Sequence, residues 1–173
     1  MGEIILDDLR SPEPITANHV LVNFDCGDGS LNYWLQKRAV KNHLSGASRC
    51  FVLCNGDEVV GYYSLSAGAI SHESAPKSMR RNMPDPLPVL LLGRLAIDRK
   101  YHNQGLGQAL LRDALLRAIV VSNNTGVFAL LVHALSESAK QFYLSRGFVE
   151  SPLHPMTLLM TLSTAKAILA ESI

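Results

Sequence analysis

Apolar residues recur at helical spacing early in the chain. Between residues 30 and 41, the apolar residues Leu31, Trp34 and Leu35 fall on one face of a 3.6-residue period. Asn32, Gln36, Lys37 and Lys41 lie elsewhere on the helix. Ser30 stands directly before the apolar face, where a serine hydroxyl can accept a hydrogen bond from the first helical turn. The pattern predicts an amphipathic helix with Ser30 as its N-cap.

The pattern then changes to that of strands. Residues 51–53 and 59–67 are rich in β-forming side chains, and Asn55-Gly56-Asp57 between them carries the Asn-Gly pair typical of a hairpin turn. Residues 71–88 contain four prolines and are predicted to be a long connection. Residues 89–97 are almost continuously apolar, as expected of a central strand covered on both faces. This part of the chain therefore predicts an antiparallel hairpin followed by a buried strand.

The second half of the chain predicts a strand–helix–strand unit. Residues 107–121 carry an apolar stripe typical of an amphipathic helix, and residues 127–132 resemble another buried strand. Ser136 can cap a short helix that Gly147 ends. A last strand and a terminal helix are predicted at residues 156–162 and 164–171. Because such a crossover favours parallel strands, the chain is predicted to be α/β with a mixed sheet of about six to seven strands.

Composition sets the class of protein. The chain has 173 residues, of which 47% are hydrophobic and 18% charged, and this fits one domain spanning residues 1–173. A net charge of +1 gives no overall attraction to nucleic acid, so a polyanionic partner would require a locally basic surface. Residues 1–10 lack the basic and apolar regions of a signal peptide, and Arg94 interrupts the longest apolar stretch. We therefore expect a cytoplasmic protein with no membrane segment.

Cysteine usage does not favour a metal centre. The chain has three cysteines, Cys26, Cys50 and Cys54, and none forms a short paired spacing with histidine. Cys50 and Cys54 lie in a strand-like segment that sends both to the same face, so we expect buried thiols there. Neither a disulfide framework nor a metal site is predicted.

The segment between the buried strand and the amphipathic helix, residues 101–107, can hold an anion. Its sequence is Tyr-His-Asn-Gln-Gly-Leu-Gly, in which glycines allow close backbone approach and the N–H groups of the helix start face outward. A tight strand-to-helix turn uses the same residues, and spacing alone favours the two interpretations equally. The segment has neither the Gly-x-Gly-x-x-Gly pattern of dinucleotide folds nor the Lys-Ser/Thr of a P-loop, which disfavours nucleotide hydrolysis.

Residues 92–118, and more loosely residues 51–162, resemble the GNAT acetyltransferases, whose Arg/Gln-x-x-Gly-x-Gly/Ala motif follows a central strand. Gly105 and Gly107 match this motif, whereas His102 stands at its first position. The resemblance implies a GNAT fold with helices on both faces of the sheet, and acetyl-CoA as the acetyl donor. It also implies cofactor contacts from the strand end and the loop that follows, namely Leu95, Ala96, Ile97, His102, Asn103, Gln104, Gly105, Leu106 and Gly107.

A second stretch, residues 136–148, ends in Phe-Tyr-x-x-x-Gly-Phe and resembles the GNAT segment after the fifth strand. In that family the tyrosine commonly lies near the cofactor sulfur, so the resemblance implies that Tyr143 is the general acid for the departing thiolate. Without the family, packing of Tyr143 between helix and sheet would be favoured, and we expect Phe142 to be the core residue of the pair. Ser138 is a candidate cofactor contact, although a serine in the first helical turn usually makes local capping bonds.

Further resemblance extends over most of the chain. Two stretches are similar to the GNAT toxins of bacterial type II toxin–antitoxin pairs. The first is Phe24-Asp25-Cys26-Gly27 followed by residues 31–35, and the second is residues 59–65 followed by the basic connection into residues 92–96. The resemblance implies acetylation of the amino group of aminoacyl-tRNA, which blocks translation, and it implies a homodimer neutralised by a ribbon-helix-helix antitoxin. Candidate tRNA contacts are Lys77, Arg80, Arg81 and Arg94, with Arg99 and Lys100 nearby; ordinary solvated charge is the alternative for each.

Two other functions remain open at this point. A GNAT enzyme that acetylates a small amine or a protein N-terminus would use the same loop and tyrosine. A non-enzymatic acetyl-CoA sensor would keep residues 102–107 but would not require Tyr143. No pattern assigns a general base, for which His72, His133 and His154 are candidates by position. The amine of an aminoacyl ester needs little help from a base, because its pKa lies below the 7.7 to 8.0 typical of an α-amino group.

Overall fold

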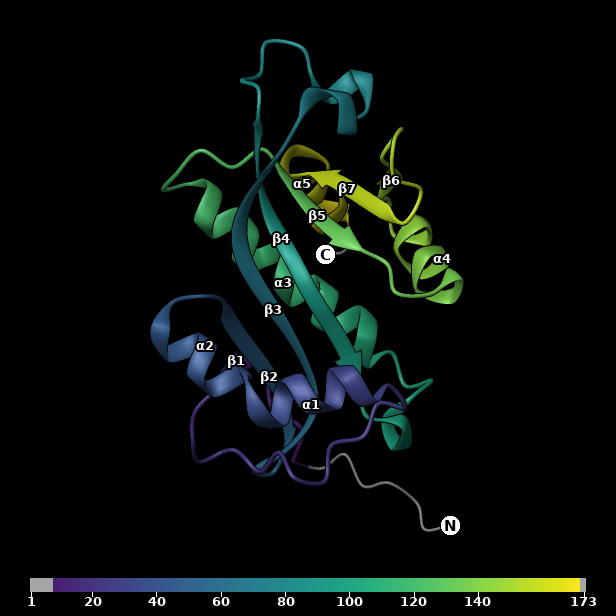
Figure 1. Cartoon of the computed structure of the whole chain (residues 1–173). Coiled ribbons are helices and arrows are strands. Elements are labelled where there is room, and N and C mark those ends of the chain that lie inside the picture. Colours follow the sequence, from purple (N-terminus) through teal and green to yellow (C-terminus); the bar gives the residue numbers. More distant parts are fainter. Residues whose placement is uncertain (1–7, 172–173) are drawn as a thin grey trace. The chain divides into compact units, whose positions relative to one another are not determined.

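The computed structural model describes residues 8–171 of the chain (Figure 1). Seven strands form one sheet in the order β1-β2-β3-β4-β5-β7-β6. The strands are β1 (Glu13–Pro14), β2 (Arg49–Asn55), β3 (Glu58–Ile70), β4 (Leu87–Ile97), β5 (Ala129–His133), β6 (Val149–Glu150) and β7 (Thr157–Thr161). The α-helices are α1 (Gly29–Lys37), α2 (Ala39–Ser45), α3 (Leu106–Ser122), α4 (Glu137–Ser145) and α5 (Leu162–Glu171). Short 3-10 turns are η1 (His72–Ser74), η2 (Lys77–Met79) and η3 (Arg99–Tyr101).

The sheet is mixed. β2 pairs antiparallel with β1 and β3, β4 pairs parallel with β5, and β7 pairs antiparallel with β5 and β6. The predicted hairpin is present, since Asn55 pairs with Glu58 across a two-residue turn. The parallel pair is the one that the strand–helix–strand pattern predicts. The α/β class and the mixed sheet are therefore confirmed.

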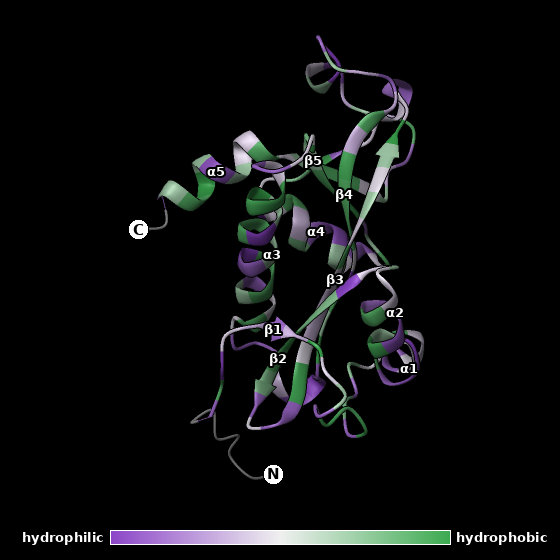
Figure 2. Cartoon of the chain, turned by 90° about the vertical axis from the view of Figure 1, so that its left-hand side faces the viewer, coloured by the Kyte–Doolittle hydropathy of each residue, from purple (hydrophilic) through white to green (hydrophobic). Residues whose placement is uncertain are grey.

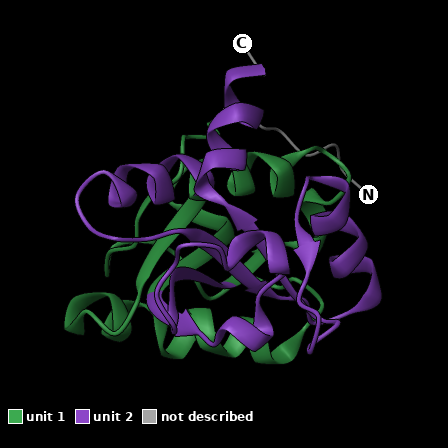
Figure 3. Cartoon of the chain, turned by 90° about the horizontal axis from the view of Figure 1, so that it is seen from above, with its two compact units in different colours: residues 1–66, 94–114 green, residues 67–93, 115–173 purple. Residues whose placement is uncertain are grey.

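The chain divides into two compact units, which Figure 3 colours separately. Unit 1 comprises residues 1–66 and 94–114, and unit 2 comprises residues 67–93 and 115–173. β3, β4 and α3 each run from one unit into the other.

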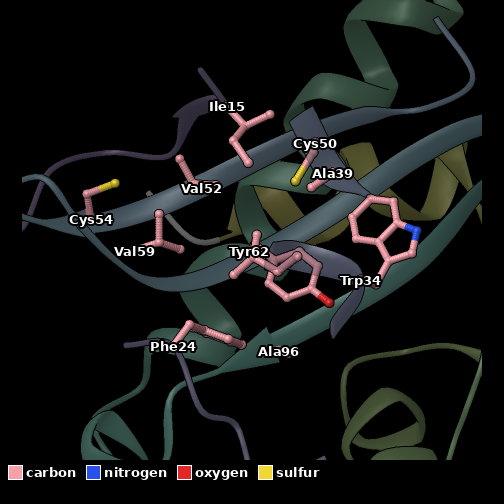
Figure 4. Packing of buried hydrophobic residues seen from close by; sticks show 11 residues of the cluster. Ile15, Phe24, Trp34, Ala39, Cys50, Val52, Cys54, Val59, Tyr62 and Ala96 are labelled. Carbon is pink, nitrogen blue, oxygen red and sulfur yellow. The ribbon is translucent and has the colours of Figure 1, made fainter. Parts of the chain in front are cut away.

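Two neighbouring tyrosines of β3 show how helices cover both faces of the sheet in unit 1. The ring of Tyr62 stacks on Trp34 of α1 with centroids 5.8 Å apart, while Phe24 meets it edge-on (Figure 4). Tyr63 stacks on Phe51 of β2 and hydrogen-bonds through its hydroxyl to Asp113 of α3. Successive strand residues point to opposite faces, so α1 and the first half of α3 lie on opposite faces (Figure 2). Helices on both faces are confirmed.

The first helix differs from its prediction at both ends. Asp28, not Ser30, is the N-cap: its carboxylate accepts hydrogen bonds from the N–H groups of Ser30 at 2.9 Å and Leu31 at 3.3 Å. The Ser30 hydroxyl donates to the same carboxylate, because Ser30 already lies inside the first turn. The single helix predicted to reach residue 41 ends at Lys37, since Arg38 leaves the helical region with φ −124°, and α2 then begins at Ala39.

The core of unit 1 includes the two strand cysteines. Cys50 and Cys54 are free thiols that are 0% and 1% exposed and lie in one apolar cluster with Val52 and Tyr62. Burial raises the pKa of the Cys50 thiol to about 12. The prediction of buried thiols is confirmed for both residues.

Unit 2 is built around a fully buried strand. The four residues of β5 before His133 are all buried, between β4 on one side and β7 on the other. α4 and α5 pack on β7. The connection after β3 is folded rather than loose, because Ala75 and Met79 are buried in the same cluster as Val89 and Leu131. The basic residues of this connection are thus carried on an ordered segment.

Candidate cofactor and catalytic site

The predicted site residues are divided between the units. The strand end Leu95–Ile97 and the loop from His102 to Gly107 belong to unit 1, whereas Ser138 and Tyr143 belong to unit 2.

Within residues 8–171 no helix combines the length and hydrophobicity needed to cross a bilayer.

The predicted cofactor loop, residues 102–107, leads from the end of β4 to the start of α3. Asn103 and Gly105 take positive φ angles of 63° and 76°, which turn the chain sharply just before the helix. Residues 102–105 are exposed, while Leu106 is buried and fixes the first residue of α3. Ala109 N–H donates to the Gly105 carbonyl at 3.1 Å and closes the first turn of α3. The N–H groups of a first helical turn have no acceptor within the helix and can bind an anion. The arrangement fits an anion at this position.

His102 is bound to the backbone of its own loop. Its Nε2 donates to the Ile97 carbonyl, 2.7 Å away, at the last residue of β4. The imidazole thereby joins the strand end to the loop. A histidine at the first motif position consequently supports the shape of the loop through this hydrogen bond.

Close packing also fixes the strand end. Gly61 of β3 lies so near that an added Cβ would be 2.7 Å from Ile97 Cδ1 and 3.1 Å from Leu110 Cδ1. Asp98 N–H donates to the Val60 carbonyl at 2.8 Å. The glycine therefore allows β4 and α3 to meet β3 where the cofactor loop begins.

A hydrogen-bonded network with no signal in the sequence connects the segment before α1 to this loop. The buried carboxylate of Asp98 accepts hydrogen bonds from the N–H groups of Asp25 and Lys100 at 3.1 and 2.9 Å. The Arg99 guanidinium contacts the Asp25 carboxylate at 2.6 Å. Hydrogen bonds from Gly27 and Asn32 lower the pKa of Asp25, which keeps it ionised. Asp25 falls in the Phe-Asp-Cys-Gly stretch noted in the sequence, but nothing there indicated its partners.

Tyr143 is a buried residue of α4. It is 5% exposed and lies edge-on to Phe142 and Phe148, with centroids 5.2 and 5.3 Å away. Phe142 is only half-buried, so the expectation that Phe142 is the core member of the pair is wrong. The reason is the helix phase, which turns Tyr143 toward Phe148. Burial raises the pKa of the Tyr143 phenol, so the group stays protonated at neutral pH and can act as a proton donor.

Ser138 makes a local contact. Its hydroxyl lies 3.1 Å from that of Ser136, the N-cap residue, which accepts a hydrogen bond from Ala139 N–H. The predicted Ser136 cap of this helix is confirmed. Ser138 is exposed, so its hydroxyl also faces solvent.

The candidate tRNA-binding residues differ in whether their side chains make contacts within the chain. Arg80 Nε donates to the Ala75 carbonyl at 2.8 Å, and the Arg94 guanidinium lies 4.0 Å from the centroid of the Trp34 ring. Lys77 and Arg81 are exposed on the basic connection. Two of the four cations are thus fixed by their own unit, and two extend into solvent.

The histidines proposed as bases also differ. His72 Nε2 donates to the Pro84 carbonyl at 2.7 Å, which occupies that ring nitrogen. His133 and His154 line a cavity of about 360 Å³ in unit 2. Position in the fold therefore favours the last two over His72.

A group of Glu13, His19 and Cys54 was not predicted, and its ligand atoms lie within 4.8 Å of one another. His19 Nδ1 accepts from Thr16 N–H at 2.9 Å, so Nε2 carries the proton and donates to Glu13 at 2.9 Å. This hydrogen bond lowers the pKa of Glu13. A metal ion would have to displace the proton through which His19 holds Glu13, so the arrangement is better described as a hydrogen-bonded pair.

The family model described as "Acetyltransferase (GNAT) domain" matches residues 46–150. The chain belongs to the GNAT acetyltransferase family. It is 44% identical to a tRNA-acetylating toxin of Mycobacterium tuberculosis over 93% of this chain and 97% of that protein. It is 24% identical to a probable toxin TacT of Sinorhizobium fredii, over 92% and 95% of the two chains.

Solved structures agree with this assignment. AtaT complexed with acetyl-methionyl-tRNAfMet has 32% identity and a TM-score of 0.87, over 94% of this chain and 99% of that one. A tyrosine-to-phenylalanine mutant of KacT has 29% identity and a TM-score of 0.88 over the same shares. The similarity thus extends over nearly the whole of each chain.

Proposed function

We propose that this chain transfers the acetyl group of acetyl-CoA to the amino group of aminoacyl-tRNA and, by blocking translation, acts as the toxin of a toxin–antitoxin pair. The observation that carries the proposal is the 44% identity with a tRNA-acetylating toxin across almost the full length of both proteins. The complex of AtaT with an acetylated aminoacyl-tRNA supports the same acceptor for a chain of this fold.

The cofactor side of the site fits acetyl-CoA, which supplies the activated acetyl group as a thioester. The exposed loop and the start of a 17-residue helix offer N–H groups and a positive dipole end to the diphosphate. We assign this contact to Asn103, Gln104, Gly105 and Gly107, and to the backbone of Leu106, whose side chain is buried. The backbone of Leu95–Ile97 lies along the pantetheine arm, and His102 holds the loop in place through Ile97. Ser138 adds a hydroxyl contact.

We propose that Tyr143 is the general acid of the reaction. When the amine attacks, an N–C bond forms, the C–S bond breaks, and the departing thiolate needs a proton. A phenol kept neutral by burial provides that proton from its hydroxyl. Tyrosine-to-phenylalanine mutants of AtaT and KacT are among the solved relatives, and the same change is the natural test in this chain.

The tRNA contacts are proposed on the basic connection and β4. Lys77 and Arg81 are exposed and contact phosphates directly. Arg80 and Arg94 present guanidinium groups that are already held by Ala75 and Trp34, so they lose little side-chain entropy on binding. Such contacts position the tRNA without reading its sequence.

The partners follow from the same relationship. AtaT has been solved with the C-terminus of the antitoxin AtaR. We propose a ribbon-helix-helix antitoxin for this chain, a homodimer, and a cytoplasmic location where charged tRNA is found. We also propose that residues 1–173 form a single acetyltransferase domain.

The test is an acetylation assay with radiolabelled acetyl-CoA and bulk aminoacyl-tRNA, with deacylated tRNA and free amino acids as controls. Label in RNA only when the tRNA is charged supports the proposal. Absence of label, from protein that binds acetyl-CoA in calorimetry, favours a small amine or a protein N-terminus as the acceptor.

Two variants assign the roles. Tyr143→Phe is expected to lower turnover by at least about 100-fold while acetyl-CoA affinity is retained, because only the proton is removed. Tyr33→Phe on the 54% exposed tyrosine of α1 is the matched control. Lys77→Glu with Arg81→Glu is expected to weaken tRNA binding and reduce its salt dependence, and unchanged binding would remove both residues from the interface.

A further inference from the structure

The cavity in unit 2 has chemistry suited to a small polar group. Its lining combines apolar side chains with hydroxyl and imidazole groups. The apolar side chains include Ile70, Val89, Leu91 and Leu131, and the polar ones are Ser71, Ser74, Thr157, His133 and His154. Its volume of about 360 Å³ lies at the small end of the range for ligand pockets. The residues that line it include no Asp, Glu, Lys or Arg. The cavity therefore accommodates an uncharged end group rather than a polyanion.

Hydrogen bonds hold its walls in place. The hydroxyl of the buried Ser151 donates to the Ser74 carbonyl at 2.6 Å, which ties η1 to the segment before β7. Ala134 N–H donates to the Met156 carbonyl at 2.8 Å, which ties that segment to the end of β5. Hydrogen bonds thus join three segments that are separate in the sequence.

His133 occupies a particular position in this wall. The parallel pairing of β4 and β5 ends at Leu92 and Val132, and His133 is the next residue of β5. On its other side His133 pairs with Thr157 of β7. β4 continues from there to Leu95–Ile97, the proposed pantetheine contact, and the chain after His133 leads into the helix of Tyr143. His133 thus lies at the end of β5 where its pairing with β4 stops.

An attacking amine must lose a proton, and imidazole is the side chain that can take one up near neutral pH. His133 and His154 are the titratable residues that line the cavity. His72 and Glu73 of η1 lie outside the lining, and the lining residues of β3, β4 and β7 include no titratable side chain. His133 Nδ1 lies 2.9 Å from Thr157 Oγ1. When Nδ1–H donates to this hydroxyl, Nε2 carries the lone pair that a base requires.

We propose that this cavity admits the aminoacyl end of the acceptor and that His133 is the general base of the reaction. The N–C bond forms as the amine nitrogen passes a proton to His133 Nε2, and the C–S bond breaks as Tyr143 protonates the sulfur. Thr157 is a positioning residue, because its hydroxyl hydrogen-bonds Nδ1 and orients the imidazole ring. This inference rests on the proposed function, because it takes an aminoacyl ester as the acceptor.

The test measures single-turnover acetylation of aminoacyl-tRNA by the full chain, at saturating acetyl-CoA, between pH 5 and 7. The wild type needs both a neutral amine and a base that can accept a proton, so log rate is expected to rise with pH with a steeper slope than in His133→Gln, in which only the amine remains. The rate of His133→Gln near pH 7 is expected to drop by about 100-fold. Tyr33→Phe, at an exposed residue of α1 outside the cavity, is the control and keeps the wild-type rate and slope.

Rescue separates a base from a structural role. Added imidazole is expected to restore part of the activity of His133→Ala, and Thr157→Val is expected to lower the rate severalfold without changing acetyl-CoA affinity. A His133→Gln rate within threefold of the wild type with an unchanged slope overturns the assignment of His133 alone. A wild type that acetylates no aminoacyl-tRNA overturns the proposed function and this inference together.

Discussion

Tyr62 offers a direct test of how unit 1 is held together. Its side chain is fully buried, its ring stacks on Trp34, and its hydroxyl donates to the Leu31 carbonyl at 2.8 Å. Tyr62→Phe keeps the ring contacts and removes only the hydroxyl. The Leu31 carbonyl belongs to α1 and retains its intrahelical partner, so the loss lies in the lower part of the range for a buried hydrogen bond, about 1 kcal/mol. For a chain of this size that loss lowers Tm by about 2 to 4 °C.

The assay is equilibrium unfolding in denaturant together with calorimetry, with Tyr33→Phe on the exposed side of α1 as the control. A second signature comes from pH. Burial raises the pKa of Tyr62, so the contribution of the protonated phenol to stability is present below pH 10 and is lost as the pH rises further. The difference between wild type and Tyr62→Phe should therefore shrink above pH 10. A loss above about 3 kcal/mol would refute the reasoning, since it would mean that the ring contacts had not been kept.

Two further perturbations test local features. Asp28→Ala removes the N-cap of α1 and is expected to lower the unfolding free energy by about 1 kcal/mol. Ser30→Ala should lower it by less, and denaturant midpoints measure both losses. Equal losses would contradict the assignment of Asp28 as the cap. Because burial raises the pKa of Cys50 from 9.0 to about 12, its contribution to stability is present below pH 9 and is lost as the pH rises toward 12. Unfolding free energies from pH 8 to 11 should fall less steeply in Cys50→Ala.

The elements predicted correctly are those with strong local signals. Asn55-Gly56-Asp57 and the pair Ser136 and Gly147 specify a turn and two helix ends by their own chemistry, so neighbouring segments are not needed to find them. β1 and β6 have two residues each, too few to show a period. The prediction of Ser30 as the N-cap of the first helix is wrong because Asp28 is also a capping residue type. The sequence does not show that the helix begins at Gly29, which makes Asp28 the cap.

The same limit applies to neighbouring aromatic residues. Phe142 and Tyr143 differ by one position, and a helix turns about 100° per residue, so the sequence alone leaves their order of burial open. Contact with Phe148, five residues beyond Tyr143, decides it. A residue named for its chemistry can thus also be a packing residue, and here the burial that packs Tyr143 also keeps its phenol protonated.

The proposed cofactor loop shows which features of a candidate site can be predicted from residue spacing. The two glycines and the helix that follows are local, and they were found from the motif. The supports of the loop are not local, since Asp25 and Arg99 are 74 positions apart and meet only in the folded chain. His102 has a similar role, because it binds the carbonyl at the end of β4. At the first position of the motif, a histidine that holds the loop in this way can replace the usual Arg or Gln, provided that the backbone N–H groups of the loop keep their positions.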